Sequence, residues 1–285
     1  MEHLDMLLKE KALCQKIDSD EEEDDDEDHD EVILGSVTDL LISIIKVSGE
    51  TFSNYFKDLL PALNRYTKPS RPASDKTAVM GVLAEAINCM PSYMSQHAEY
   101  ILQSALTFME EGNEGLSRNC CYTLGCICEL FNDKATPFYA QILAAMGKVF
   151  ACKDQEAKDN AVSAAARMVC AAPTALPLED CVNSILTNIP LTGDYEETGA
   201  VVRFIVLFSK EKPELLANHK ENILKTLCYA LLPERTGESC VHYETDVVTL
   251  FKQMSADADT QTLAESIVGS FDEDEQAIIK TKFNQ

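Results

Sequence analysis

A period of 41 residues runs through the middle of this chain, in the aligned stretches AVMGVLAE (78–85), NCCYTLGC (119–126) and NAVSAAAR (160–167). Small residues recur at the positions where two helices would pack closely. Self-similarity at a period of about 40 residues is typical of proteins built from stacked helix pairs. Because one such pair cannot bury its apolar face alone, the sequence predicts an array in which each pair packs on the next.

The remaining segments are also helical in pattern. Short breaks with Pro, Gly or Asn separate them, and none shows the sustained alternation of apolar and polar residues that marks a strand. We expect helices near 30–48, 51–66, 74–90, 95–111, 114–132, 136–151, 155–172, 178–190, 194–210, 214–232, 238–255, 259–271 and 273–283. The helices come in pairs. A basic residue near the start of three second helices is expected to be structural: Lys76, Arg118 and Lys158.

The pairs have the pattern of HEAT repeats. In such a repeat one helix resembles YFKDLLPAL (55–63), and the next helix begins with a basic residue that is followed by small residues. The sequence therefore predicts an all-α protein. We expect an α-solenoid, a right-handed superhelix of about five to six HEAT repeats that forms a single domain over residues 1–285.

Negative charge is concentrated near the start of the chain. Between Asp18 and Glu31, 12 of 14 residues are acidic, and their mutual repulsion favours a solvated, disordered loop. The chain carries a net charge of −24, and removing these 12 charges leaves −12 for the other 271 residues. This balance argues against nucleic acid and membranes as partners, and it favours a basic protein.

Motifs for catalysis and for metal binding are missing from the sequence. The five histidines are scattered, and there is no GxSxG, GxxxxGK[ST] or GxGxxG. Cys120, Cys121, Cys126 and Cys128 lack the paired spacing of a zinc site, so we expect them to be buried thiols. The sequence thus predicts no enzyme activity, no cofactor and no metal.

Membrane and secretory signals are also missing. The longest apolar runs, 39–45 and 201–208, are far shorter than the roughly 20 residues that cross a bilayer, and the N-terminal MEHLDMLLKEK lacks a secretory pattern. We therefore expect a soluble intracellular protein with free thiols. Residues 1–16 are expected to form an amphipathic helix with an apolar side made of Leu4, Leu7, Leu8 and Leu13.

The order of four motifs resembles that in the C-terminal third of importin-β-family karyopherins, in particular the importin-4 type. These motifs are DKTAVMGVLAEAI (75–87), SRNCCYTLGCICELF (117–131), AKDNAVSAAARMV (157–169) and PLTGDYEETGAVVRFIVLF (190–208). The resemblance implies a nuclear import receptor that shuttles between cytoplasm and nucleus, of which this chain is a C-terminal fragment. It also implies that the helix at 1–16 pairs with the helix at 32–48 across the acidic loop. The full-length receptor would bind Ran in its GTP form and nucleoporins, and we expect a monomer.

The same resemblance places a cargo site on the second helices, which would line a concave groove. Asparagine side chains can hold the backbone of an extended peptide while nearby carboxylates receive lysine side chains. Asn119 and Asn160 occupy the same repeat position, and Tyr122 or Tyr195 would wall the lysine pocket. The expected carboxylates are Glu85, Asp159, Glu196 and Glu197. The cargo would be a basic nuclear localisation signal, as in histone tails or ribosomal proteins.

Each of these residues also has a structural interpretation. Asp194 and Glu197 have the spacing of a capping box. Asn119 and Asn160 could bond across repeats, and Glu85 could pair with a basic residue of an adjacent helix. A protein of another class, a HEAT scaffold or a histone-chaperone-like assembly subunit, would bind folded partners through its ridges and loops instead of a groove.

Overall fold

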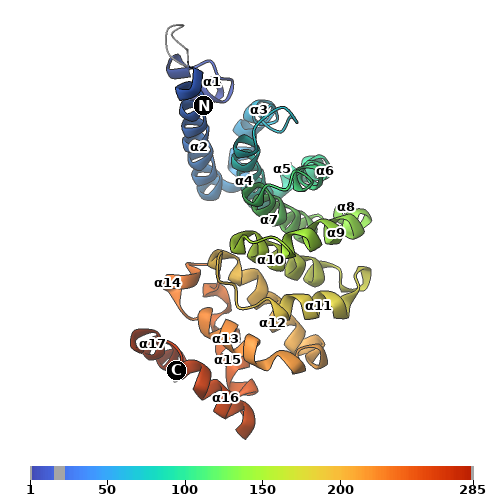
Figure 1. Ribbon diagram of the computed structural model, residues 1–285, viewed down its shortest axis with the longest axis vertical. Coiled ribbons are helices and arrows are strands. Elements are labelled where there is room, and N and C mark those ends of the chain that lie inside the picture. The colour runs from blue at the N-terminus through green and yellow to red at the C-terminus, as the bar shows by residue number, and fades with distance from the viewer. Residues whose placement is uncertain (1, 16–22, 284–285) are drawn as a thin grey trace. The chain divides into compact units, whose positions relative to one another are not determined.

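The computed structural model describes residues 2–15 and 23–283 as helices joined by turns, and no strand occurs among them (Figure 1). The all-α, helix-repeat fold is therefore confirmed. The chain divides into two compact units, residues 1–145 and 146–285. The two units are described one at a time below.

The first unit is built around a row of three helices. In this row α4 (Ala73–Cys89) packs between α2 (Glu23–Ser48) and α7 (Glu114–Leu130). On their flanks, α1 (Glu2–Leu8) packs on α2 and α3 (Ser53–Leu63), and α6 (Ala98–Met109) packs on α7. The short helices α5 (Pro91–Met94) and α8 (Asn132–Ala135) lie in the connections, and α9 (Tyr139–Phe150) extends past the end of this unit. Large side chains at the centre of this unit are fully buried: Phe56, Leu59, Leu63, Met80, Leu83 and Ile87.

The second unit has two rows of helices. In one row α12 (Thr198–Glu211) packs between α10 (Gln155–Ala171) and α15 (Glu244–Met254). In the other, α13 (Lys220–Tyr229) packs between α11 (Leu178–Thr187) and α16 (Ala258–Gly269). The short helix α14 (Pro233–Thr236) precedes α15, and the last helix, α17 (Glu273–Phe283), contacts α15 and α16. Each second helix thus packs against second helices of neighbouring pairs, as the repeat predicts.

Several helices begin later than the sequence predicts, because 3₁₀ turns precede them. The helix expected from 194 starts at Thr198, after a 3₁₀ turn at Tyr195–Glu197. The helix expected from 238 starts at Glu244, after a similar turn at Val241–Tyr243. Such turns are common at helix termini and continue the apolar pattern, so periodicity alone does not separate them from the helix.

The first predicted helix is shorter than expected. Helix α1 ends at Leu8, and Glu10 adopts a left-handed backbone with φ of 57°. The amide of Lys11 donates to the carbonyl of Met6 at 2.9 Å, which closes the helix as a left-handed cap does. Consequently Leu13 is 80% exposed and does not extend the apolar side that ends with the buried Leu8. The expected pairing of this helix with 32–48 is present, since α1 packs against α2.

The acidic segment differs in part from the expected loop. Residues 18–22 lie outside the described residues, but residues 23–31 belong to α2, so a loop over that part is wrong. Acidic residues near the N-terminus of a helix interact favourably with the helix dipole, and adding residues to an existing helix costs less than starting a new one. The helix that the sequence places at 32–48 therefore extends backward into the acidic run.

One helical stretch is apolar enough to cross a membrane by length and composition. Residues 30–63 contain an 18-residue window with a mean hydropathy of 1.7. The uninterrupted apolar runs of the sequence are shorter than 18 residues, and the mean hydropathy over a longer window is a different measure. Helices in the core of a folded protein can have the same composition, and α2 buries Leu34, Leu41 and Ile45 while it packs against α4.

A basic residue at the start of a second helix has the structural role expected of it. The side chain of Lys76 is buried, and its Nζ donates to both carboxylate oxygens of Glu111, at 2.8 and 3.0 Å. The same Nζ donates to the carbonyl of Pro69 at 3.3 Å. Lys76 therefore links α4 to the end of the next pair's first helix.

Close packing between repeats predicts a position-specific effect of adding one methyl group. A Cβ atom at Gly199, in the first turn of α12, would lie 2.4 Å from the carbonyl oxygen of Ser239. A Cβ atom at Gly147 in α9 would meet nothing within 4 Å. We expect Gly199→Ala to lower the free energy of unfolding by about 1–3 kcal/mol. Gly147→Ala should leave it unchanged or raise it by up to about 1 kcal/mol. Urea unfolding followed by circular dichroism measures both, and equal stability of the two variants would contradict this packing.

Candidate functional site

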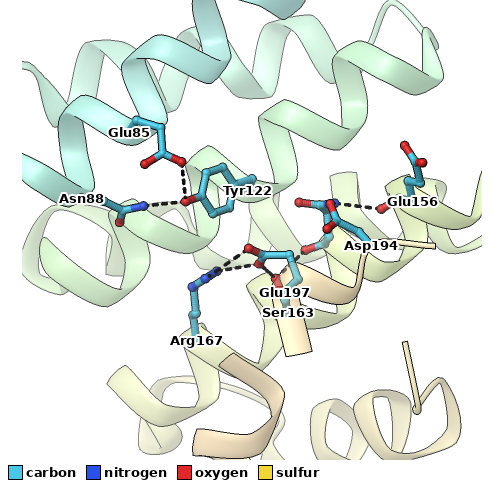
Figure 2. Close-up of polar contacts among 9 residues, drawn as sticks. Glu85, Asn88, Tyr122, Glu156, Ser163, Arg167, Asp194 and Glu197 are labelled. Carbon is cyan, nitrogen blue, oxygen red and sulfur yellow. Dashed lines mark hydrogen bonds and ion pairs between the residues drawn. The ribbon is translucent and has the colours of Figure 1, made fainter. Parts of the chain in front are cut away.

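A polar cluster in the first unit contains two of the predicted site residues. The hydroxyl of Tyr122 on α7 donates to Oε1 of Glu85 on α4 at 3.1 Å, and Nδ2 of Asn88 donates to the Tyr122 oxygen at 2.7 Å. Figure 2 shows these three side chains pointing toward one another from the two helices. Lys46 on α2 also pairs with Glu85, with Nζ 3.5 Å from Oε1. Three successive second helices thus contribute to one cluster.

The ion pair in this cluster is open to exchange. The side chain of Lys46 is 53% exposed. The side chain of Glu85 is 14% exposed, so the exposed member of the pair is the lysine. Because solvent screens the ammonium group and the long lysine side chain loses freedom, the pair contributes about 1 kcal/mol. An ammonium group of a bound peptide could therefore replace that of Lys46 at Glu85 with little loss of stability.

Asn119 links two repeats. Its Nδ2 donates to the backbone carbonyl of Thr77 at 2.8 Å, which ties α7 to the first turn of α4. This is the cross-repeat bond that the structural interpretation of Asn119 predicts. This bond uses one of the two N–H donors of the Asn119 amide group, so the other donor is not committed to it.

Asp159 in the second unit is enclosed by backbone amides. Its Oδ2 accepts hydrogen bonds from the amides of Thr192, Gly193 and Asp194 at 2.8, 2.6 and 2.9 Å, and its Oδ1 accepts from Nε2 of Gln155 at 2.8 Å. The residue is 0% exposed. Asp159 therefore fixes the turn before α12, and a lysine could reach it only by breaking these bonds.

Asn160, next to Asp159, is also committed within the fold. Its Nδ2 donates to the carbonyl of Glu156 at 2.9 Å and to Oδ2 of Asp194 at 2.8 Å. Asp194 makes no side-chain cap on the following turn, so the expected capping box of Asp194 and Glu197 is not formed. The physical reason is the bond to Asn160, which holds the Asp194 carboxylate on α10.

Glu197 instead forms a buried ion pair across the repeat. Its Oε2 lies 2.8 Å from NH1 of Arg167 and also accepts a hydrogen bond from the hydroxyl of Ser163. The residue is 7% exposed. Removing one member of a buried pair leaves an unpaired charge in a medium of low dielectric constant, which is strongly destabilising. Glu197 is thus a support for the packing of α10 against the start of α12.

Glu196 and Tyr195 differ from their neighbour. Glu196 is exposed, and its carboxylate makes no hydrogen bond or ion pair with another described residue. Tyr195 lies beside Arg235 of α14, whose guanidinium carbon is 5.8 Å from the centre of its ring. The same guanidinium lies 4.7 Å from the ring of Tyr229 and bonds to Glu275 at 2.7 Å. The aromatic wall that the sequence predicts for a lysine therefore contacts an arginine of the chain itself.

Sequence reasoning missed the partners of the predicted residues. These partners are Lys46, Asn88, Arg167, Arg235 and Glu275. The repeat period offers a signal, because Arg235 bonds to residues 40 positions away on both sides, Tyr195 and Glu275. Pairing polar residues that are separated by one repeat period would therefore predict these contacts.

Cysteines and metal ligands form no second site in the described part of the chain. The group Cys120, Cys121, Cys126 and Cys128 is buried. Burial raises the pKa of the Cys128 thiol above its usual range and raises that of Cys228 to about 12, so neither is a thiolate at neutral pH. No group of three or more metal-binding side chains occurs among the described side chains, those of residues 2–15 and 30–283.

The fold and the links between repeats define a class of helical-repeat protein, and comparison with known proteins shows which of them this chain resembles. The family described as Importin repeat 6 matches residues 8–69. This match covers α2 and α3, the helices on either side of the first connection. Together with the relatives below, this match shows that the chain is similar to proteins of the importin type.

Its relatives are of the importin-4 type. Importin-4 of Homo sapiens is 25% identical over 237 residues, which cover 81% of this chain and 22% of the relative. Importin-4 of Mus musculus is 24% identical over 81% of this chain, and the probable importin subunit beta-4 of Schizosaccharomyces pombe is 19% identical over 79%. The chain spans about a fifth of the length of these relatives.

The bonds of Asp159 predict a large effect on stability. Asp159→Ala would leave three backbone amides of the 192–194 turn without an acceptor in a buried place. An unsatisfied buried group costs about 1–3 kcal/mol, so we expect a loss of about 3–5 kcal/mol in the free energy of unfolding. Asp259→Ala, at an exposed position in the first turn of α16, should change it by less than about 1 kcal/mol. Urea unfolding of both variants provides the measurement, and a similar loss in each would refute the anchoring role.

Proposed function

We propose that this chain acts in nuclear transport, as a receptor segment that binds a basic nuclear localisation signal of cargo. The observation that carries the proposal is the similarity to importin-4 proteins over about four-fifths of the chain. The net charge of −24 supports a basic ligand, since opposite charges speed association and suppress acidic competitors. Histone tails and ribosomal proteins are cargo of this chemistry.

Two of the predicted carboxylates fit direct contact with cargo best. Glu85 is held by an exposed lysine that a ligand can replace, with Tyr122 and Asn88 beside it. Glu196 is exposed and forms no bond that a ligand would have to break. We propose that lysines of the cargo pair with these two glutamates.

The other predicted residues would support the structure of the unit to which each belongs. Asp159, Asn160 and Glu197 are nearly or fully buried and already satisfied within the fold. Asn119 is bonded to Thr77, and Tyr195 faces Arg235. In this proposal they orient the second helices, and direct contact with the cargo backbone would require them to exchange partners.

The receptor role brings further proposals. A transport receptor must release its cargo in one compartment, so we propose that Ran in its GTP form and nucleoporins act on the full-length receptor. We further propose that the receptor moves between cytoplasm and nucleus. Recognition of this kind is equilibrium binding, which needs no catalytic group and no cofactor.

A scaffold that binds folded partners remains the second candidate. The observation that favours it is the internal bonding of Asp159, Asn160 and Glu197, which leaves fewer side chains available for an extended peptide. A scaffold or histone-chaperone-like subunit would use ridges and connections, and the chain would then be insensitive to the order of residues in a basic peptide.

Fluorescence anisotropy with a labelled, lysine-rich histone-tail peptide separates the two candidates. We expect the native peptide to bind more tightly than a scrambled peptide of equal charge, at low and at near-physiological salt. The double variant Glu85→Gln with Glu196→Gln should raise Kd by about three- to tenfold, the equivalent of two partly exposed ion pairs.

The matched control is Glu99→Gln with Glu234→Gln, which removes the same charge from exposed positions on α6 and α14. It should leave Kd nearly unchanged. Equal and salt-labile binding of both peptides, with equal loss in both double variants, would show a general acidic surface and would favour the scaffold.

A further inference from the structure

Four connections that each lead from a second helix to the next first helix share one backbone geometry at their first residue. These residues are Met90, Phe131, Ala172 and Lys212, which follow one another at intervals of 41, 41 and 40 residues. Their φ and ψ angles are −131° and 50°, −131° and 47°, −149° and 65°, and −146° and 57°. The four connections therefore occupy equivalent places in the repeat.

The third connection lacks one turn. Residues 90–97, 131–138 and 212–219 each form two short helical turns before the next long helix begins. Residues 172–177 form a single turn, Pro173–Ala175, and the chain then runs extended through Leu176, with φ of −124° and ψ of 157°. This connection is two residues shorter than the other three, so the space of a second turn is not filled by its own backbone.

An open pocket of about 440 Å³ lies at this shortened connection, wholly within the second unit. One side is formed by residues 177–180, from the end of the connection and the first turn of α11. The other side is formed by Lys212, Glu214 and Leu215 of the following connection. Pro177, the last residue of the shortened connection, lines the pocket, so the pocket adjoins that connection.

Neighbouring connections in the first unit are tied together, whereas these two are not. Oε1 of Glu50 accepts from the amide of Ser92 at 2.6 Å, and Nζ of Lys134 bonds to Ser95 of the connection before it. Within the described residues no hydrogen bond or ion pair joins the side chains of 177–180 to those of 212–215, the two sets that line the pocket. The two walls of the pocket can therefore accept a ligand without first breaking a link.

Lys212 breaks the apolar pattern of its repeat position. The equivalent Met90, Phe131 and Ala172 are buried, at 0%, 6% and 9% exposure. Lys212 is half-buried and forms no ion pair with a described residue. An apolar side chain at this position would be expected to lie inside the pocket. A lysine can instead line the pocket wall with its methylene groups and extend its ammonium group to water.

We propose that this pocket binds a short extended segment of a partner protein in which a basic residue adjoins an aliphatic one. The aliphatic side chain would contact Leu178 and Leu215, which are half-buried in the pocket. The basic side chain would pair with carboxylates of the rim, Glu179, Asp180 and Glu214, which are exposed and form no bond to another described side chain. Three carboxylates against the single ammonium of Lys212 favour a cation over an anion as ligand.

The pocket is separate from the cargo surface proposed above. It lies past the C-terminal end of α12, whereas Glu196 precedes the N-terminal end of that 14-residue helix, which at 1.5 Å per residue spans about 20 Å. The inference does not depend on the proposed function, and failure of one leaves the other intact.

Nuclear magnetic resonance of the ¹⁵N-labelled full chain tests the proposal with the capped peptide acetyl-Gly-Arg-Leu-Gly-amide. We expect saturable chemical-shift changes of the backbone amides of residues 178–180, 212, 214 and 215. Pro213 has no amide proton and gives no signal. Acetyl-Gly-Arg-Ser-Gly-amide and acetyl-Gly-Glu-Leu-Gly-amide should bind more weakly, because the first lacks the aliphatic contact and the second reverses the charge.

The variant Glu179→Gln with Glu214→Gln keeps the shape of the pocket and removes two charges. It should raise Kd for the Arg-Leu peptide by about three- to tenfold. Glu221→Gln with Glu238→Gln removes the same charge from exposed positions outside the pocket and should leave Kd unchanged. The absence of saturable shifts, shifts at other residues, or tighter binding of the Glu-Leu peptide through Lys212 would each overturn the proposal.

Discussion

Burial of apolar faces between successive second helices is the interaction on which the rest of this structure depends. Helix α4 is enclosed by α2 and α7 in the first unit, and α12 by α10 and α15 in the second. Each fully buried Leu, Ile or Phe contributes about 1.5–3 kcal/mol, so a pair of helices is stable only with its neighbours in place. The same requirement places polar residues of one repeat within bonding distance of the next, which produces the bonds from Asn119 to Thr77 and from Asn160 to Asp194.

These cross-repeat bonds limit what the second helices can offer to a ligand. Asp159 and Glu197 hold the start of α12 against α10, and their oxygens are already paired with amides, a hydroxyl and a guanidinium. A buried carboxylate with these partners is costly to release, since both the charge and the freed donors would lose their solvation. Glu196 is exposed and has no such cost, and Glu85 would exchange the ammonium group of Lys46 for that of the ligand. Recognition of a basic segment would therefore concentrate at these two glutamates.

Departures from the repeat are as informative as the repeat itself. The first residue of three connections is buried, namely Met90, Phe131 and Ala172, whereas the equivalent Lys212 is not. In addition, the connection at 172–177 is one turn shorter than the others. The resulting pocket places three carboxylates beside two leucines. A repeat protein can accept such a local change because each pair contacts only its neighbours, so a shortened turn does not disturb distant helices.

The sequence by itself determined the fold class and the positions of the long helices, because apolar periodicity and the 41-residue period are properties of single segments and of their spacing. It did not determine that residues 23–31 join α2, since helix extension depends on the helix already formed at 32–48. Nor did it separate Glu196 from Glu197: both stand in the same acidic pair, but only the packing of α10 against the following turn buries one beside Arg167 and leaves the other in solvent. Burial and pairing are set by residues about one repeat away in sequence, and only the tertiary structure brings those residues into contact.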